Sequence, residues 1–162
     1  MILLRVSVPE KQMRKVVARL RDGKLLRGYL TTPAAESLEE SLREDAPTFN
    51  RQIEIHSVAS RESILVSLDS LKAVFFVKTF DGRKDYEEVK FFAKSPPIRG
   101  LWVRVQFFDH ECIEGVVENS LRYLLEPGFF MKPPDDQSNN EILYVIKSSL
   151  SEFRILGVRT EY

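Results

Sequence analysis

Apolar and polar residues alternate along two stretches of the chain that match each other. Val16 to Leu30 reads VVARLRDGKLLRGYL, and Val103 to Val117 reads VRVQFFDHECIEGVV. Each stretch has one alternating run, a turn, and a second run that contains a glycine. Alternation with a period of two gives a strand one buried face, and Asp22-Gly23 supplies the positive φ that a tight hairpin needs. The pattern therefore predicts two β-hairpins, the second turning at Asp109-His110.

A second pair of matching segments follows the hairpins in the same order. Ile64 to Phe76 aligns with Leu143 to Ile155, so that Val66 falls on Val145. Two matched blocks in one order indicate an internal repeat. We expect each repeat to form five short strands, with a short helical turn before the last of them, that curl into a small barrel.

Three segments are expected to depart from this pattern. Met13 to Leu20 fits both a strand and a helical stripe, and we prefer a short helix over Pro9 to Lys15 followed by a strand from Val16. Thr31 to Asn50 is rich in acids, which predicts a solvated helical excursion or a mobile loop. Tyr86 to Phe92 predicts one or two helical turns.

These boundaries predict a mainly β protein made of two tandem five-stranded small barrels with short helical segments. The first barrel spans residues 1–78 and includes the N-terminal helix and an acidic insertion at 31–50. The linker spans 79–99, and the second barrel spans 100–162.

The first hairpin carries the pattern apolar-x-apolar-x-apolar-x-Asp-Gly-x-x-apolar-x-Gly over Val16 to Gly28. This pattern resembles the Sm-like and SH3-like small-barrel superfamily, and Val103 to Gly115 repeats it with His110 in place of the turn glycine. The segment GFFMKPPDDQSNNEILYV also resembles an uncharacterised bacterial domain family. The resemblance implies barrels that bind RNA, proline-rich peptides or proteins, and such a fold assigns no function by itself.

Composition narrows the functional classes by exclusion. The 24 basic and 24 acidic side chains cancel, so any electrostatic site must be local. The single Cys112 cannot form an internal disulfide, and the apolar run from Met1 to Leu4 is too short for a signal peptide. No stretch approaches the roughly 18 apolar residues that span a membrane. We therefore expect a cytoplasmic protein with no membrane contact.

Signatures of an enzyme are missing from the sequence. It has no Gly-rich phosphate loop, no G-x-S-x-G and no paired-cysteine zinc site. The run from Asp109 to Cys112 groups four polar side chains, but neighbours in a hairpin point to alternating faces, so we interpret it as a plain turn. We expect no catalysis, no cofactor and no metal.

Basic residues gather on the first hairpin and form one candidate site: Arg19, Arg21, Lys24 and Arg27. If Ala18 faces the core, Arg19 and Arg21 share the outer face of one strand with Lys24 and Arg27 on its partner, and the stripe can contact the phosphates of RNA. A solvated or internally paired face is the alternative interpretation.

A dense polar loop forms a second candidate site, either for a partner or for a cation: Asp135, Asp136, Ser138, Asn139 and Asn140. Asn and Asp also tolerate left-handed turn conformations, so a turn without a ligand is the alternative. Two further residues, Phe75 and Phe108, face outward in the predicted register. We expect both rings to be largely buried, most of all between the two barrels.

These observations favour a non-enzymatic bacterial interaction or regulatory module that binds a protein partner. The first alternative is an Sm-like RNA-binding protein that uses the basic strand face. A weaker alternative is an enzyme or metal-binding protein that uses the loop at 135–140. Association into a homo-oligomer is compatible with each of these interpretations.

Overall fold

The residues that the structure describes form ten β-strands. The computed structural model describes residues 11–33, 51–82, 88–94, 96, 100–120, 125–135 and 137–159. The first half contains β1 (Lys11–Leu20), β2 (Leu25–Pro33), β3 (Gln52–Ser57), β4 (Ser63–Ser67), the 3-10 turn η1 (Leu68–Ser70) and β5 (Leu71–Val77). The second half contains β6 (Gly100–Phe107), β7 (Cys112–Val117), β8 (Gly128–Lys132), β9 (Asn140–Ile146), η2 (Lys147–Ser149) and β10 (Leu150–Arg159). The mainly β prediction is confirmed.

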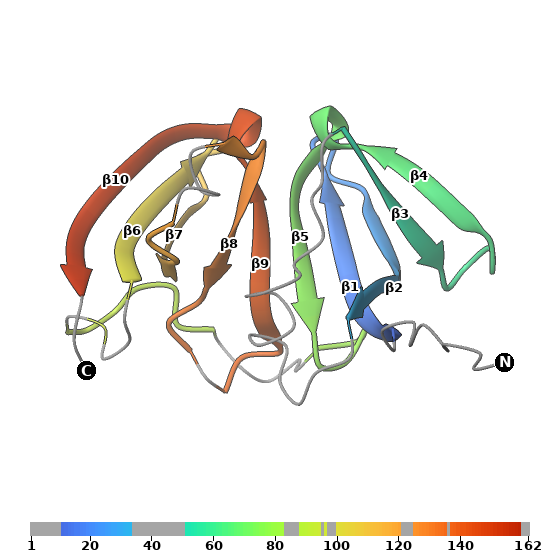
Figure 1. The fold of residues 1–162 in the computed structure, drawn as a ribbon, viewed down its shortest axis with the longest axis horizontal. Coiled ribbons are helices and arrows are strands. Elements are labelled where there is room, and N and C mark those ends of the chain that lie inside the picture. The colour runs from blue at the N-terminus through green and yellow to red at the C-terminus, as the bar shows by residue number, and fades with distance from the viewer. Residues whose placement is uncertain are drawn as a thin grey trace, which may run out of the picture.

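All ten strands belong to one antiparallel sheet, in the order β10-β6-β7-β8-β9-β5-β1-β2-β3-β4. Each half contributes five neighbouring strands, and the halves meet where β5 pairs with β9 (Figure 1). We call this pairing the seam. The sheet is not closed into a barrel, because β10 and β4 stand at its two ends.

The backbone pairing follows the alignment of the two sequence repeats. Val16 of β1 lies opposite Phe76 of β5, and the aligned residues Val103 and Ile155 lie opposite each other in β6 and β10. Both ladders also carry an irregularity close to the start of the fifth strand of their half. The two halves therefore share their strand order and the register of their first and last strands.

Two hydrophobic cores meet at the seam, and each contains side chains of both halves. The first core joins the strands of the first half to three residues of β9: Ile142, Tyr144 and Ile146. The second core joins the strands of the second half to three residues of β5: Ala73, Phe75 and Val77. Alternate residues of a strand point to opposite faces, so β5 and β9 each serve both cores. Each half thus completes its core with a strand of the other half.

The second strand of the first half approaches the third strand closely at Gly28. A Cβ atom there would overlap the backbone oxygen of His56, and a Cβ on Gly115 would overlap the side chain of Met131. Only glycine permits such an approach between strands. These contacts explain why the sequence has glycine at both positions.

The two tight hairpins lie where the sequence predicts them, between β1 and β2 and between β6 and β7. In both turns the last strand residue donates its N–H to the carbonyl four residues later, at 2.9 Å. Gly23 has φ of 91° in the first turn, and His110 has φ of 72° in the second. A left-handed backbone conformation raises the energy of an L-residue but not that of glycine, so the backbone at His110 is strained.

The short helical turns expected before the fifth strand of each half are present as η1 and η2. The helix expected over Pro9 to Lys15 and the helical turns expected over Tyr86 to Phe92 are wrong where the structure describes those residues. Lys11 to Lys15 belong to β1, whose first residues pair with β2 as far as Pro33. This ladder pairs the backbone groups of β1 with those of β2. A short helix in place of the start of β1 would leave the facing groups of β2 without these partners. Residues 88–92 form irregular chain rather than helical turns. Most of the acidic insertion, residues 34–50, lies outside the described residues.

The two phenylalanines expected between the halves differ in burial. Phe75 is 3% exposed and belongs to the second core, as expected. Phe108 is 38% exposed, so the expectation of a largely buried ring is wrong. It stands in the hairpin turn, where the guanidinium of Arg21 covers it at 4.9 Å from the ring centroid. Arg21 belongs to the first half, so Phe108 contacts that half without being buried by it.

Candidate functional site

A groove with a volume of about 240 Å³ lies beside the seam and contains residues of both halves. We call it the seam groove. Its floor is the face of β1, β2 and β5 that points away from the first core: Val17, Arg19, Leu25, Arg27, Phe75 and Val77. Its rim comes from the chain after β5, from the loop before β9 and from the first residue of β9: Phe80, Asp81, Gly82, Glu88, Ser138, Asn139 and Asn140.

Strand register places two arginines on the floor of the groove. Arg27 lies opposite Val17, and Arg19 lies opposite Leu25 in the β1·β2 ladder. The arginines therefore occupy diagonal positions on neighbouring strands, about 7 to 8 Å apart. Guanidinium groups bind carboxylates and phosphates through pairs of hydrogen bonds, so this floor has the chemistry of a candidate anion site bordered by apolar side chains.

The two arginines differ in what holds them. The guanidinium of Arg19 lies 4.4 Å from the ring centroid of Phe75 and 3.7 Å from a carboxylate oxygen of Glu111. Arg27 is exposed, and within the described part of the chain no acidic side chain pairs with it. Arg19 is thus oriented by its neighbours, whereas Arg27 is available to a ligand.

Hydrogen bonds fix the polar loop on the rim to the linker. Ser138 donates its hydroxyl to the Glu88 carboxylate at 2.7 Å, and Asn140 donates its amide to the same group at 3.1 Å. The side-chain oxygen of Asn139 accepts from the N–H and the hydroxyl of Thr79 at 3.0 and 3.1 Å. The loop therefore acts as a clamp that gives the rim a defined position.

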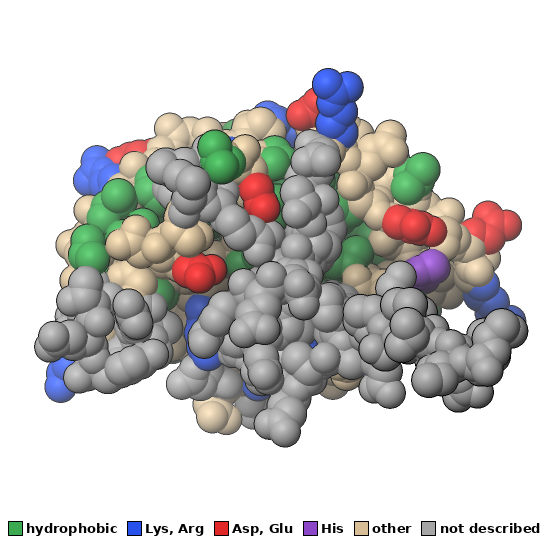
Figure 2. Space-filling view, viewed as in Figure 1, with side chains coloured by type: hydrophobic (Ala, Val, Ile, Leu, Met, Phe, Trp, Pro, Cys, Tyr) green, Lys and Arg blue, Asp and Glu red, His purple; other side chains and the backbone are tan. Residues whose placement is uncertain are grey.

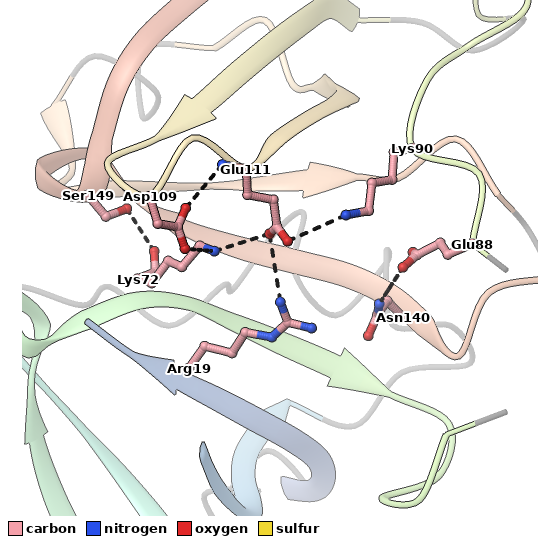
Figure 3. Close-up of polar contacts among 8 residues, drawn as sticks. All are labelled: Arg19, Lys72, Glu88, Lys90, Asp109, Glu111, Asn140 and Ser149. Atoms are coloured by element: carbon pink, nitrogen blue, oxygen red, sulfur yellow. Dashed lines mark hydrogen bonds and ion pairs between the residues drawn. The ribbon is translucent and has the colours of Figure 1, made fainter. Parts of the chain in front are cut away.

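Charged side chains converge at the seam next to the groove, from β1, β5, the second hairpin and the linker (Figure 3). Lys72 donates to Asp109 at 2.7 Å and to Glu111 at 3.2 Å. Glu111 also lies 3.7 Å from Arg19 and 3.4 Å from Lys90. We call these five residues the ion cluster. They connect the first half, the linker and the second half in one network.

The interpretation of the run from Asp109 to Cys112 as a plain turn is incomplete. Asp109 and Glu111 are two positions apart, so their side chains reach the same side of the hairpin and meet one ammonium group, that of Lys72. Among the described residues, no group of three or more His, Cys, Asp or Glu side chains could hold a metal ion. The convergence that the sequence reasoning excluded for a metal thus occurs around a lysine.

The ion cluster lowers the pKa of both hairpin acids. The hydrogen bond from Lys72 holds the pKa of Asp109 below its ordinary value. Burial pushes the pKa of Glu111 upward, but the charges of Lys72, Lys90 and Arg19 outweigh it and hold that pKa below its ordinary value too. Both acids are therefore ionised at neutral pH and compensate the charge of Lys72, whose side chain is only 7% exposed.

A buried carboxylate, Glu114, holds the linker against the second half. It is 2% exposed and accepts from the Trp102 indole at 3.0 Å and from Arg104 at 2.7 Å. It also accepts from the backbone N–H of Phe92 at 3.2 Å. A buried carboxylate with this many donors is satisfied within the fold. Its role is to anchor the chain that leads to the rim of the groove.

The structure separates the four basic residues of the first hairpin. Two of them, Arg19 and Arg27, line the seam groove. Arg21 instead crosses the seam and donates to the carbonyl of Ser148 at 3.2 Å. Lys24 stays in the turn, 3.9 Å from Asp22. The stripe is therefore divided between a groove, a contact between halves and a turn.

The structure also divides the polar loop. Ser138, Asn139 and Asn140 line the seam groove. Asp135 accepts from the N–H of Val89 at 3.1 Å, and Asp136 lies outside the described residues. Two candidate sites that stand far apart in the sequence thus contribute to one groove.

Sequence reasoning missed the aromatic rim and the ion cluster. Phe80 lies outside the repeat, and its ring packs edge-on against Tyr29 at a centroid distance of 5.4 Å. Lys72 is the one charged residue in the strand LKAVFFV. A lone lysine in a fully buried strand requires acidic partners, and this signal was available in the sequence.

The fold and the groove define an antiparallel β protein with a groove of mixed polar and aromatic lining beside the seam of two similar halves. The chain belongs to a family of unknown function, DUF6982, whose model matches residues 12–157 and so spans both halves and the linker. No curated protein and no solved structure matches the chain. In the described segments, no helix has the length and apolar character needed to cross a membrane.

Proposed function

We propose that this protein is a non-enzymatic interaction module whose seam groove binds a segment of a partner protein in the cytoplasm. The observation that carries the proposal is the convergence of Arg19 and Arg27 with the clamped polar loop in one groove. The bound segment presents a carboxylate to the arginines and an apolar side chain to Phe80 and to Leu25, which is 48% exposed. Binding sites of this kind combine an apolar surface with a few placed polar groups.

The charges of the groove favour a peptide over a nucleic acid. Glu88 and Asp81 stand on the rim opposite the basic floor, and these acids repel a continuous phosphate backbone. In addition, the basic residues of the first hairpin do not form one continuous stripe, since Arg21 donates to Ser148 and only Arg19 and Arg27 line the groove. A segment of alternating charge and apolar character fits this arrangement better than RNA does.

The proposal includes a finer description of the fold. Each half is interpreted as an opened small barrel of the Sm-like or SH3-like kind, supported by its five-stranded order and by the 3-10 turn that precedes its last strand. The seam is then the contact between two such units. Placing the groove beside the seam makes binding depend on both halves.

Selection of peptides on the folded full chain tests the proposed function. A random peptide library displayed on phage is selected on the wild-type protein, and enriched peptides are measured by fluorescence anisotropy. We expect peptides with an acidic residue beside an aromatic or aliphatic one. Arg27→Glu is expected to weaken their binding by about 100-fold, since it replaces an attractive contact with a repulsive one. Lys24→Glu is the matched control and leaves affinity within about threefold.

Two results would overturn the proposal. One is the absence of any enriched peptide whose binding depends on Arg27. The other is nucleic acid that copurifies at low salt, seen as a raised ratio of absorbance at 260 to 280 nm, and that leaves at high salt. Phosphate contacts weaken steeply with salt, so the second result would favour the RNA-binding alternative.

A further inference from the structure

The two strands at the ends of the sheet expose apolar side chains. On β10, Ile155 and Val158 are each 56% exposed, and on β4, Leu65 is 65% exposed. Hydrophobic side chains reach the surface over both strands (Figure 2). An edge strand with unpaired backbone groups and apolar side chains is a template for pairing with another strand. β10 is such a strand and spans ten residues.

Both end strands have counterparts at the seam, where the same positions are buried. In the repeat alignment, β10 corresponds to β5 and β4 corresponds to β9. Ile155 aligns with Phe76, which is 1% exposed, and Leu65 aligns with Tyr144, which is 0% exposed. The last strand of the first half therefore has a partner within the chain. The last strand of the second half pairs with β6 alone and has no neighbour on its other edge among the described residues.

The seam also supplies a register for the missing pairing. At the seam, Phe76 of β5 lies opposite Ile142 of β9. The aligned residues of the end strands are Ile155 of β10 and Ser63 of β4. In this register the exposed Leu65 lies against the middle of β10, where its apolar surface leaves water.

We propose that β10 of one molecule pairs antiparallel with β4 of a second copy of this chain, in the register of the seam. A second copy fits because each molecule carries both strands of the seam type, one at each end of its sheet. β10 and β4 lie at opposite ends of the molecule, so the pairing joins different molecules head to tail (Figure 1). Contacts between unlike surfaces build rings when the rotation closes and filaments when it does not.

Disulfide trapping tests the register. In a Cys112→Ser background, Ser63→Cys and Ile155→Cys are made as separate full-length proteins, mixed and oxidised. Opposite residues of paired strands lie close enough for a disulfide. We expect a covalent pair of chains from the mixture and none from either protein alone. Val58→Cys mixed with Ile155→Cys is the control, because Val58 is 46% exposed but lies outside the predicted contact.

The mass of the unmodified protein tests the assembly itself. Light scattering over a dilution series is expected to give multiples of the 18.8 kDa chain at high concentration. Ile155→Lys is expected to raise the dissociation constant by about tenfold or more, because a charge at an edge position opposes strand addition. Leu125→Lys, at a residue 74% exposed and away from both edges, is the matched control and leaves the mass unchanged. Thermal melting confirms that both variants fold.

The proposal is overturned if the wild-type chain stays monomeric at every concentration. It is also overturned if the Val58→Cys mixture cross-links as well as the Ser63→Cys mixture does. An assembly that survives Ile155→Lys would place the contact on another surface and would exclude the β10·β4 pairing.

Discussion

The ammonium group of Lys72 lies 2.7 Å from a carboxylate oxygen of Asp109, although the two residues belong to different halves of the chain. Ser149 adds a second polar contact between the halves, because its hydroxyl donates to the carbonyl of Lys72 at 2.9 Å (Figure 3). The halves are therefore held together by polar contacts as well as by the two shared cores.

Replacing Lys72 by methionine should destabilise the protein by about 2 kcal/mol, because Asp109 and Glu111 lose hydrogen bonds from a charged donor. Methionine keeps most of the buried volume, so the loss reports on charge rather than on packing. Denaturant unfolding followed by circular dichroism measures the change. Lys24→Met, at a side chain 81% exposed, should leave the free energy of unfolding nearly unchanged. Equal stability of the Lys72 variant and the wild type would show that the ion cluster does not hold the halves together.

The ion cluster also predicts acid sensitivity. Asp109 and Glu111 have lowered pKa values in the folded chain, so their contribution to stability is fully present above their unfolded-state pKa values of about 4. It is lost as the pH falls through the lower folded-state values. Unfolding measured at a series of pH values should therefore show a decline in stability below about pH 4 that is smaller in Lys72→Met. Parallel curves for the two proteins would contradict this origin.

Substituting glycine for His110 should stabilise the protein by up to about 1 kcal/mol, because the backbone at this turn has positive φ. Gly23→His in the first hairpin is the reciprocal control. A Cβ on Gly23 meets no atom within 4 Å, so that variant should lose stability through backbone strain alone. The two variants should shift the melting temperature in opposite directions. A loss of stability in His110→Gly would mean that the imidazole makes a favourable contact of its own.

Introducing a charge at Phe75 should destabilise the protein by at least about 3 kcal/mol, because the ring is buried in the second core. Phe108→Asp is the matched control, since that ring is 38% exposed, and it should cost clearly less. Chemical denaturation of both variants measures the difference. A loss of stability as large for Phe108→Asp as for Phe75→Asp would contradict the burial that separates the two rings.

Local patterns predicted the elements that depend on neighbouring residues. The hairpin turn at Asp22-Gly23 follows from residues that prefer positive φ, and the alternation of Val16 and Ala18 with polar residues follows from one buried face. The start of β1 differs from the helix predicted over Pro9 to Lys15 because Met13 to Leu20 fits both periods. Pairing with β2 decided between them, and that contact comes from the tertiary structure.

The seam could not be predicted from the sequence. A strand that is apolar at every position but one, such as LKAVFFV with its single Lys72, indicates that both of its faces are buried but not which strand covers them. The groove could not be predicted for the same reason, because Arg27 and Asn140 line one groove only after β5 pairs with β9. The residue types of the candidate site were visible in advance, whereas their common location required the long-range pairing.

β5 and β9 each contribute side chains to both cores, so the order of their synthesis affects when the chain can fold. β5 is synthesised before β9, the strand that pairs with it. Contacts between residues distant in sequence form slowly, because a long loop must close first. Until β9 has been made, Phe75 and its neighbours on β5 lack the strand that buries them, and exposed apolar surface of this kind favours aggregation.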